Sequence, residues 1–162
     1  SLTPDGVQAL YQRGLNATNL HKKGDLYTLS SLRRGLPMLA TAAEHGHINA
    51  MRAYASHHVQ AGVIDAVGLL GMDASEAAAV GMTWILVAAH MNHEIPESDR
   101  PTFAVLLDPS SPFPDGFFDQ DSGFSWLLQI FNAETMGPIR RRASHLAHCI
   151  NRHRAADSLS RR

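Results

Sequence analysis

Apolar residues recur at helical spacing along most of the chain. In the first twenty residues they lie three or four positions apart, which places them on one helix face: Val7, Leu10, Tyr11 and Leu15. Thr3 and Pro4 precede them as a capping residue and a first-turn proline, and Lys22-Lys23-Gly24 provides a stop. No alternating pattern, typical of a half-buried strand, runs longer than four residues. The pattern therefore predicts an all-α protein.

The next two helices are predicted from 25 to 46 and from 48 to 62. The first of these begins with a cap at Asp25, and we expect a kink or a fresh start at Gly35 and Pro37, because proline removes a backbone donor. It resumes and ends near His45-Gly46. The second is predicted to end at Gly62.

The C-terminal half holds one further helix and a final helix pair. Asp73 with Glu76 has the form of a capping box and predicts a helix that ends near Asn92. The last pair is predicted at 124–133 and 138–155. The final helix has an apolar stripe at helical spacing, made of Ile139, Ala143, Leu146 and Ile150.

An internal repeat underlies these helices. When the sequence is shifted by 46 residues, 35–47 aligns with 81–93, so that the first glycine, an Ala-Ala pair and the last histidine coincide. A shift of 42 also aligns 81–86 with 123–128. A period of this length is typical of stacked helix pairs. We expect the paired positions Ala42 and Ala88 to be buried where helices touch.

Residues 42–55, with Ala-Ala-Glu-His-Gly followed by Ala-Met and an aromatic residue, resemble the junction between Sel1-like repeats. The likeness covers about 35–58, is degenerate over 76–93 and is only suggestive at 123–131. It implies one domain, 1–162, folded as a short α-solenoid of about three helix pairs, Sel1-like or tetratricopeptide-like. The repeat-like segments are about 25–47, 48–93 and 123–155, with an insertion loop at about 94–122.

Composition narrows the classes of function. The chain has 162 residues and a net charge of -1, so bulk charge gives it no reason to bind nucleic acid or an anionic membrane. The uncharged apolar stretch 77–89 is shorter than a membrane span and predicts a buried helix. Cys149 is the only cysteine, which excludes an internal disulfide. The chain begins at Ser1, either because the sequence has been trimmed or because a leader has been removed, and the second alternative slightly favours the bacterial periplasm over the cytoplasm.

Ten histidines raise the hypothesis of a metalloenzyme. His90 with His93 and His145 with His148 are spaced as helical pairs, but no third and fourth ligand is evident. The segment 119–123 is similar to part of a calcium loop, yet its twelfth position holds Ile130, which cannot ligate. We therefore expect no catalytic residues, no metal and no cofactor.

Charge is unevenly distributed along the C-terminal half. Residues 94–121 hold seven acids and one base, and residues 140–162 hold seven arginines and one acid. The basic helix has two interpretations: a phosphate-binding surface, or a solvated closing helix that the acidic segment partly neutralises.

The segment 108–123 is the predicted partner-binding site. It combines prolines, which lower the entropy lost when a loop is immobilised, with aromatic residues and aspartates. The candidate contact residues are Phe113, Asp115, Phe117, Phe118, Asp119 and Asp121. The alternative is that the phenylalanines pin the insertion onto the helices.

The resemblance implies a protein-binding domain without catalysis. Its best-fitting role is a bacterial immunity protein that neutralises a cognate secreted toxin by direct binding, such as a phospholipase effector of a type VI secretion system. The alternative is a Sel1-like scaffold or adaptor in signalling or envelope assembly.

Overall fold

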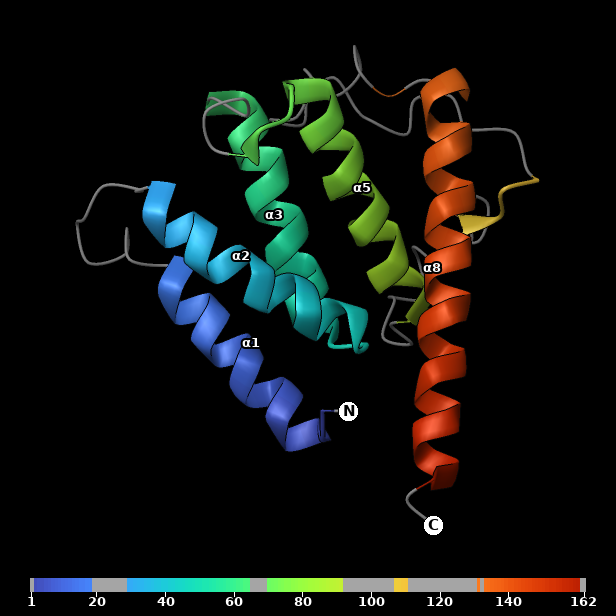
Figure 1. Cartoon of the computed structure of the whole chain (residues 1–162). Coiled ribbons are helices and arrows are strands. Elements are labelled where there is room, and N and C mark those ends of the chain that lie inside the picture. The colour runs from blue at the N-terminus through green and yellow to red at the C-terminus, as the bar shows by residue number, and fades with distance from the viewer. Residues whose placement is uncertain are drawn as a thin grey trace, which may run out of the picture.

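The computed structural model describes residues 2–18, 29–64, 70–91, 107–110, 131 and 133–160. In this part of the chain there are helices and no strand, so the all-α prediction is confirmed there. The helices are α1 (Pro4–Thr18), α2 (Leu29–Glu44), α3 (Ile48–Ile64), α5 (Ala74–Met91) and α8 (Ala133–Ser160). They lie side by side in chain order, with α5 between α3 and α8 (Figure 1).

Consecutive helices pack most closely at two buried glycines. In α2, a Cβ on Gly35 would lie 2.9 Å from the carbonyl oxygen of Gly14 in α1. In α5, a Cβ on Gly81 would lie 3.0 Å from the carbonyl oxygen of Ala55 in α3. Both distances are shorter than ordinary van der Waals contact, so the two helices of each pair touch through backbone. Gly35 and Gly81 are also the first residues of the two aligned segments.

Small residues fill the contacts between helices. Ala42 is 0% exposed and Ala88 is 2% exposed, so the predicted burial of both alanines is confirmed. The main apolar cluster joins them to α8 through three residues of the predicted stripe, Ile139, Ala143 and Ile150, while Leu146 packs at its edge. A second cluster lies between α1, α2 and α3 and is built on Leu32, Leu36 and Leu39.

The caps predicted at Thr3 and Asp73 are present, and the cap predicted at Asp25 lies outside the described residues. The backbone N–H of Gly6 donates to Thr3 Oγ1 at 3.0 Å, and the N–H of Glu76 donates to Asp73 Oδ1 at 2.8 Å. At the end of α2, Gly46 has a φ of 90° and donates to the carbonyl of Ala43. Helix α2 therefore ends where the sequence predicted, in a left-handed glycine turn.

The bounds of several predicted helices differ from the structure. Helix α2 has no fresh start at Gly35 or Pro37 and continues through both residues, because leucines on both sides of Pro37 pack into the same cluster and offset one lost hydrogen bond. Helix α3 continues past Gly62 to Ile64. Helix α8 (Ala133–Ser160) extends beyond both ends of the predicted 138–155, and Pro138 lies inside it, where the missing N–H removes one hydrogen bond from the helix ladder. The helix predicted at 124–133 lies almost entirely outside the described residues.

Helix α5 is the most apolar helix of the structure. Among the described residues it is the helix that is long and apolar enough, by length and composition, to cross a membrane. Of its 18 residues, 50% are buried inside the molecule, where it packs against both α3 and α8. The apolar stretch 77–89 thus lies within a helix that has neighbours on two sides, which accounts for its composition.

Candidate functional site

The predicted partner-binding residues all lie outside the described residues. They are Phe113, Asp115, Phe117, Phe118, Asp119 and Asp121. Their role in binding stays a prediction, as does the alternative that the phenylalanines pin the insertion. Within the insertion the structure describes only residues 107–110.

Asp108, within the acidic insertion, begins a tight turn. Its Oδ1 accepts hydrogen bonds from the backbone N–H of Ser110 at 3.0 Å and from Ser110 Oγ at 2.7 Å. Its backbone carbonyl accepts a hydrogen bond from Arg140 of α8, a residue only 3% exposed. One of the seven C-terminal arginines therefore binds the backbone of the acidic insertion, a contact that neither interpretation of the basic helix predicted.

The histidines are dispersed over several helices. His57 and His58 are buried in α3, His90 lies near the end of α5, and His145 lies on the exposed side of α8. His145 Nε2 is 3.6 Å from the Sγ of Cys149. No three His, Cys, Asp or Glu side chains come together at metal-binding distance among the described residues. His93, of the predicted pair with His90, falls outside them.

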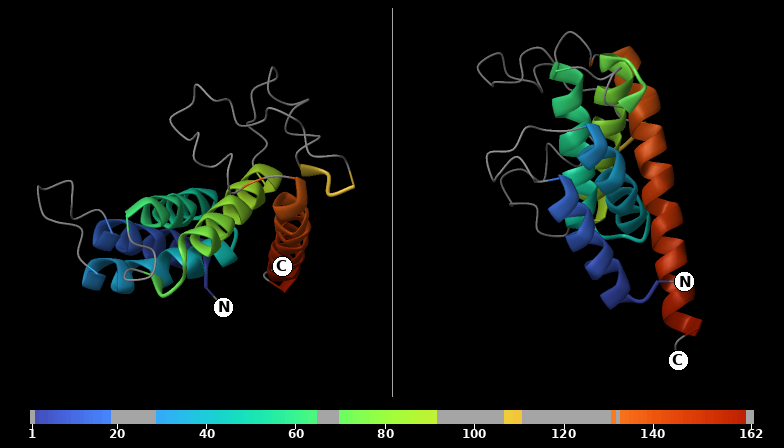
Figure 2. Two further views of the ribbon diagram at one scale, coloured as in Figure 1. Left: turned by 90° about the horizontal axis from the view of Figure 1, so that it is seen from above. Right: turned by 60° about the vertical axis from the view of Figure 1, so that its left-hand side comes forward.

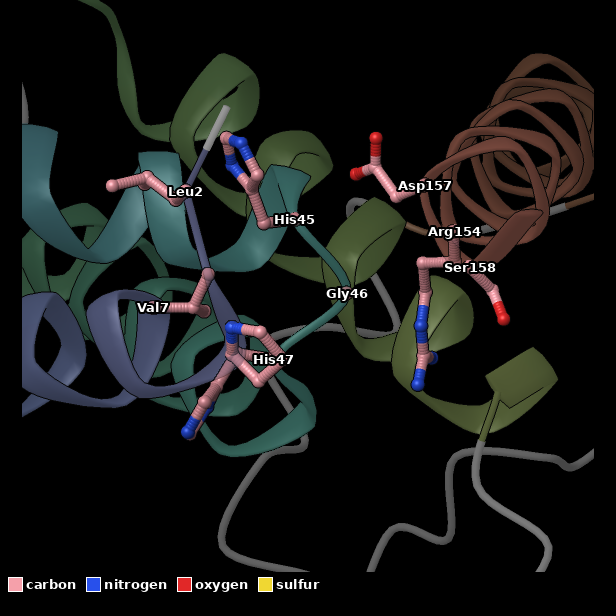
Figure 3. Close-up of a pocket in the computed structure, with 9 residues that line it drawn as sticks. Leu2, Val7, His45, Gly46, His47, Arg154, Asp157 and Ser158 are labelled. Atoms are coloured by element: carbon pink, nitrogen blue, oxygen red, sulfur yellow. The ribbon is translucent and has the colours of Figure 1, made fainter. Parts of the chain in front are cut away.

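The clearest concave site is a groove of about 360 Å³ at one end of the molecule. Three segments far apart in the sequence meet there: the start of α1, the turn between α2 and α3, and the last turns of α8 (Figures 2 and 3). Its volume is within the range of ordinary ligand pockets. It is lined by Leu2, Pro4, Val7, His45, Gly46, His47, Arg154, Asp157 and Ser158.

The groove exists because the inner face of α8 changes character along its length. From Ile139 to Ile150 this face is apolar and packs into the core. One turn further on, the same face presents Arg154, Asp157 and Ser158, which line the groove. Polar side chains at these positions do not pack against the apolar core. The end of α8 therefore leaves a groove between itself and the α2–α3 turn.

The side chain of Arg154 lies directly over Gly46, which is in the turn between α2 and α3. A Cβ on Gly46 would lie 2.8 Å from Arg154 Cδ and 3.3 Å from its Nη1. The left-handed φ favours glycine at this position, and a Cβ here would also displace the exposed arginine side chain that passes over it. The exposed guanidinium of Arg154 forms no ion pair with a carboxylate of the described residues.

His47 forms the junction between three helices. Its Nδ1 accepts a hydrogen bond from the backbone N–H of Ala50 at 3.1 Å, so it caps the start of α3. Its Nε2 therefore bears the proton and donates to Gln8 Oε1 of α1 at 2.7 Å. Its ring stacks on Tyr11, with ring centres 4.3 Å apart. These contacts hold one wall of the groove in place.

His45 and Asp157 lie at the other side of the groove. His45 Nδ1 is 2.8 Å from the carbonyl oxygen of Thr41, so this nitrogen is the donor. In Figure 3 the carboxylate of Asp157 and the guanidinium of Arg154 point away from one another. The groove therefore has a cationic side and an anionic side, rather than an internal ion pair.

Burial perturbs the titration of several groups. It lowers the pKa of His47, and a backbone hydrogen bond opposes this effect. It lowers the pKa of His58 and His90 in the same way. Burial, and secondarily the charge of Glu44, raises the pKa of Tyr54. Because their pKa values are lowered, His47, His58 and His90 are mainly neutral in the folded protein at pH 7. The neutral form is the one in which Nδ1 of His47 can accept the capping hydrogen bond.

Sequence reasoning missed the groove. His45-Gly46-His47 was recognised only as a helix end, and Arg154 only as part of a basic helix. One signal was visible: the stripe of α8 ends at Ile150, and its continuation is polar. That signal marks where α8 stops packing, but not which segments face it there.

Comparison with known proteins gives no relative. A scan against protein-family models found no matching family, and searches of curated proteins and of solved structures found no match.

Proposed function

We propose that this protein is a non-catalytic protein-binding domain of the α-solenoid type. What supports the architecture is the equivalence of its two closest helix contacts: Gly35 and Gly81 both lie in the second helix of a pair, against the backbone of the first. They share a position in the sequence repeat. Stacked helix pairs of this kind create extended binding surfaces.

The observation that supports binding is the groove at the end of the molecule. It is open, lined by three segments, and has separated charges of both signs on a rigid helical frame. Such a surface suits recognition of a protein segment, since complementary charges fix its orientation. Within the described residues every buried side-chain nitrogen or oxygen has a hydrogen-bond partner, so the polar groups left for recognition are at the surface.

The specific role we propose is that of a bacterial immunity protein that binds and neutralises a cognate secreted toxin, such as a type VI phospholipase effector. The support for this role is the likeness of residues 42–55 to a Sel1-like repeat junction. In this role the protein blocks the toxin by occupying its substrate entrance, and the acidic insertion faces a basic cleft.

The test begins with the gene beside the one for this protein. Its product, expressed as a catalytically inactive variant, should bind the purified protein in isothermal titration calorimetry, and the active toxin should not be toxic to cells that also express this protein. Absence of binding would contradict the immunity role and favour a scaffold. Replacing Phe117 and Phe118 together by Ala should weaken binding by about 2 kcal/mol if the insertion is a hot spot. Unchanged helicity in circular dichroism is the control, because loss of helicity would identify the phenylalanines as pins.

A further inference from the structure

We infer that the groove between the α2–α3 turn and the end of α8 binds an extended peptide segment that has one acidic and one basic side chain. This inference rests on the proposed protein-binding function and names its contact site. It assigns a docking surface to Arg154, Asp157 and the turn 45–47, which are different residues from the predicted contact residues of the insertion.

The guanidinium of Arg154, on the cationic side of the groove, is placed to bind a carboxylate. Arg154 lies across Gly46, and the glycine leaves room for the side chain to pass over the backbone of the turn. The guanidinium has no carboxylate partner among the described residues. A planar guanidinium with free donors binds a carboxylate through two parallel hydrogen bonds.

The anionic side gives the groove a polarity. Asp157 lies one turn further along α8, and its carboxylate points away from Arg154 (Figure 3). A single small anion would meet Arg154 but would gain nothing from Asp157. A peptide with an acid and a base a few residues apart satisfies both side chains, because an extended chain advances about 3.3–3.6 Å per residue.

The floor of the groove suits a peptide backbone. Leu2, Pro4 and Val7 supply an apolar strip, and Ser158 supplies a hydroxyl. His47 is held rigidly by Gln8 and Tyr11, so the wall is formed before binding. A site that is ordered in advance loses less entropy when a partner is bound.

The experiment is an NMR titration with a defined probe. The probe is a blocked hexapeptide with one glutamate and one lysine separated by two glycines, and the observed signals are the backbone amides of the protein. We expect a saturable shift at Gly46 and its neighbours. Replacing the probe glutamate by glutamine, or the protein change Arg154→Gln, should weaken binding about tenfold, the loss of one charge-assisted hydrogen-bonded contact. Asp157→Asn should remove the preference for a lysine-containing probe.

The matched control is Arg152→Gln. Arg152 is an exposed arginine on the same helix that does not line this groove, so this variant should bind the probe normally. Equal losses for both arginines would identify non-specific charge attraction and overturn the inference. If Arg154→Gln lowers the melting temperature, Arg154→Lys keeps the charge and the stem and should still bind more weakly.

Two other ligands of the groove would give different results in this titration. Inorganic phosphate that shifts Gly46 as strongly as the peptide, with no effect of Asp157→Asn, would identify a simple anion site. Shifts that depend on protein concentration without any probe would identify a second copy of this chain. Either result, or no saturable shift, would overturn the peptide assignment. None of these results bears on whether the neighbouring toxin binds, so the two proposals fail separately.

Discussion

Adding one methyl group at Gly35 or Gly81 tests whether the helix pairs touch as described. In an exposed part of a helix, Gly→Ala stabilises by about 0.5–1 kcal/mol, because glycine loses more backbone entropy on folding. At these two positions the added Cβ would meet the backbone of the paired helix, at 2.9 Å from the carbonyl of Gly14 and 3.0 Å from that of Ala55. The helices would have to move apart.

The expected net effect is a loss of stability. Overpacking of this kind costs about 1–3 kcal/mol, which exceeds the propensity gain. We therefore expect Gly35→Ala and Gly81→Ala each to lower the free energy of unfolding by about 0.5–2 kcal/mol. Gly35→Ala should be the more severe, because its neighbours are backbone and short side chains. The nearest atom to an added Cβ is also closer there: a methyl group of Thr18 at 2.4 Å for Gly35, compared with a methyl group of Val59 at 2.7 Å for Gly81.

The assay is urea unfolding followed by far-ultraviolet circular dichroism, with Gly137→Ala as the matched control. Gly137 lies in α8, where a Cβ would meet no neighbouring helix and, beyond its chain neighbours, only the tip of Arg141 at 3.4 Å. Because Pro138 disfavours the helical conformation of a preceding residue that has a Cβ, the propensity gain is offset, and we expect a change smaller than about 0.5 kcal/mol. The reasoning is refuted if Gly35→Ala and Gly81→Ala are as stable as the parent, because the glycines would then not lie at contacts. A loss at Gly137 equal to theirs would show that the contact is not the cause.

Two further predictions concern the helix caps and pH. Asp73→Ala should lower the free energy of unfolding by about 1 kcal/mol, because the N–H of Glu76 loses its acceptor; Asp73→Ser, which keeps an acceptor, should recover most of the loss in the same urea assay. Acidification should destabilise the fold. The pKa values of His47, His58 and His90 in the folded protein lie below the unfolded value of 6.5. The unfolded chain therefore takes up more protons than the folded chain as the pH falls through and below 6.5. Once the pH is below both values, each unit of pKa difference removes at most about 1.4 kcal/mol, and less for the partly exposed His47 and His90, where solvent screens the charge. The urea midpoint should therefore be lower at pH 5.5 than at pH 7.5. The difference should be smaller in His47→Asn, where asparagine can still cap α3. A midpoint independent of pH would contradict the lowered pKa values.

The fold class could be predicted from the sequence because the signals that start and end a helix lie within a few residues of one another. Thr3 and Asp73 are capping residues whose partners lie three positions away, and Gly46 ends α2 through bonds to the preceding turn. The burial of Ala42 and Ala88 followed from a repeat that is visible in the sequence. Each of these signals depends on contacts within a few residues, or on a pattern that occurs twice.

The errors arose where distant packing overrode a local preference. Pro37 breaks an isolated helix, yet α2 continues because leucines before and after it share one apolar cluster. The groove was missed for the same reason. Its walls come from residues 2–7, 45–47 and 154–158, and no local pattern states that these segments meet. Periodicity gives the face of a helix that is buried, but not the point at which its neighbour ends.

Gly46 links the fold to the candidate site. Its left-handed φ ends α2, and this turn directs the chain into α3, whose first residues are capped by His47. Its missing Cβ also lets Arg154 pass over the turn. The residue that ends one helix and allows the next to begin is thus the residue that leaves space for the cationic side of the groove. A side chain at this position would strain the turn and displace Arg154 together, so the shape of the groove is tied to the junction between the two helix pairs rather than to α8 alone.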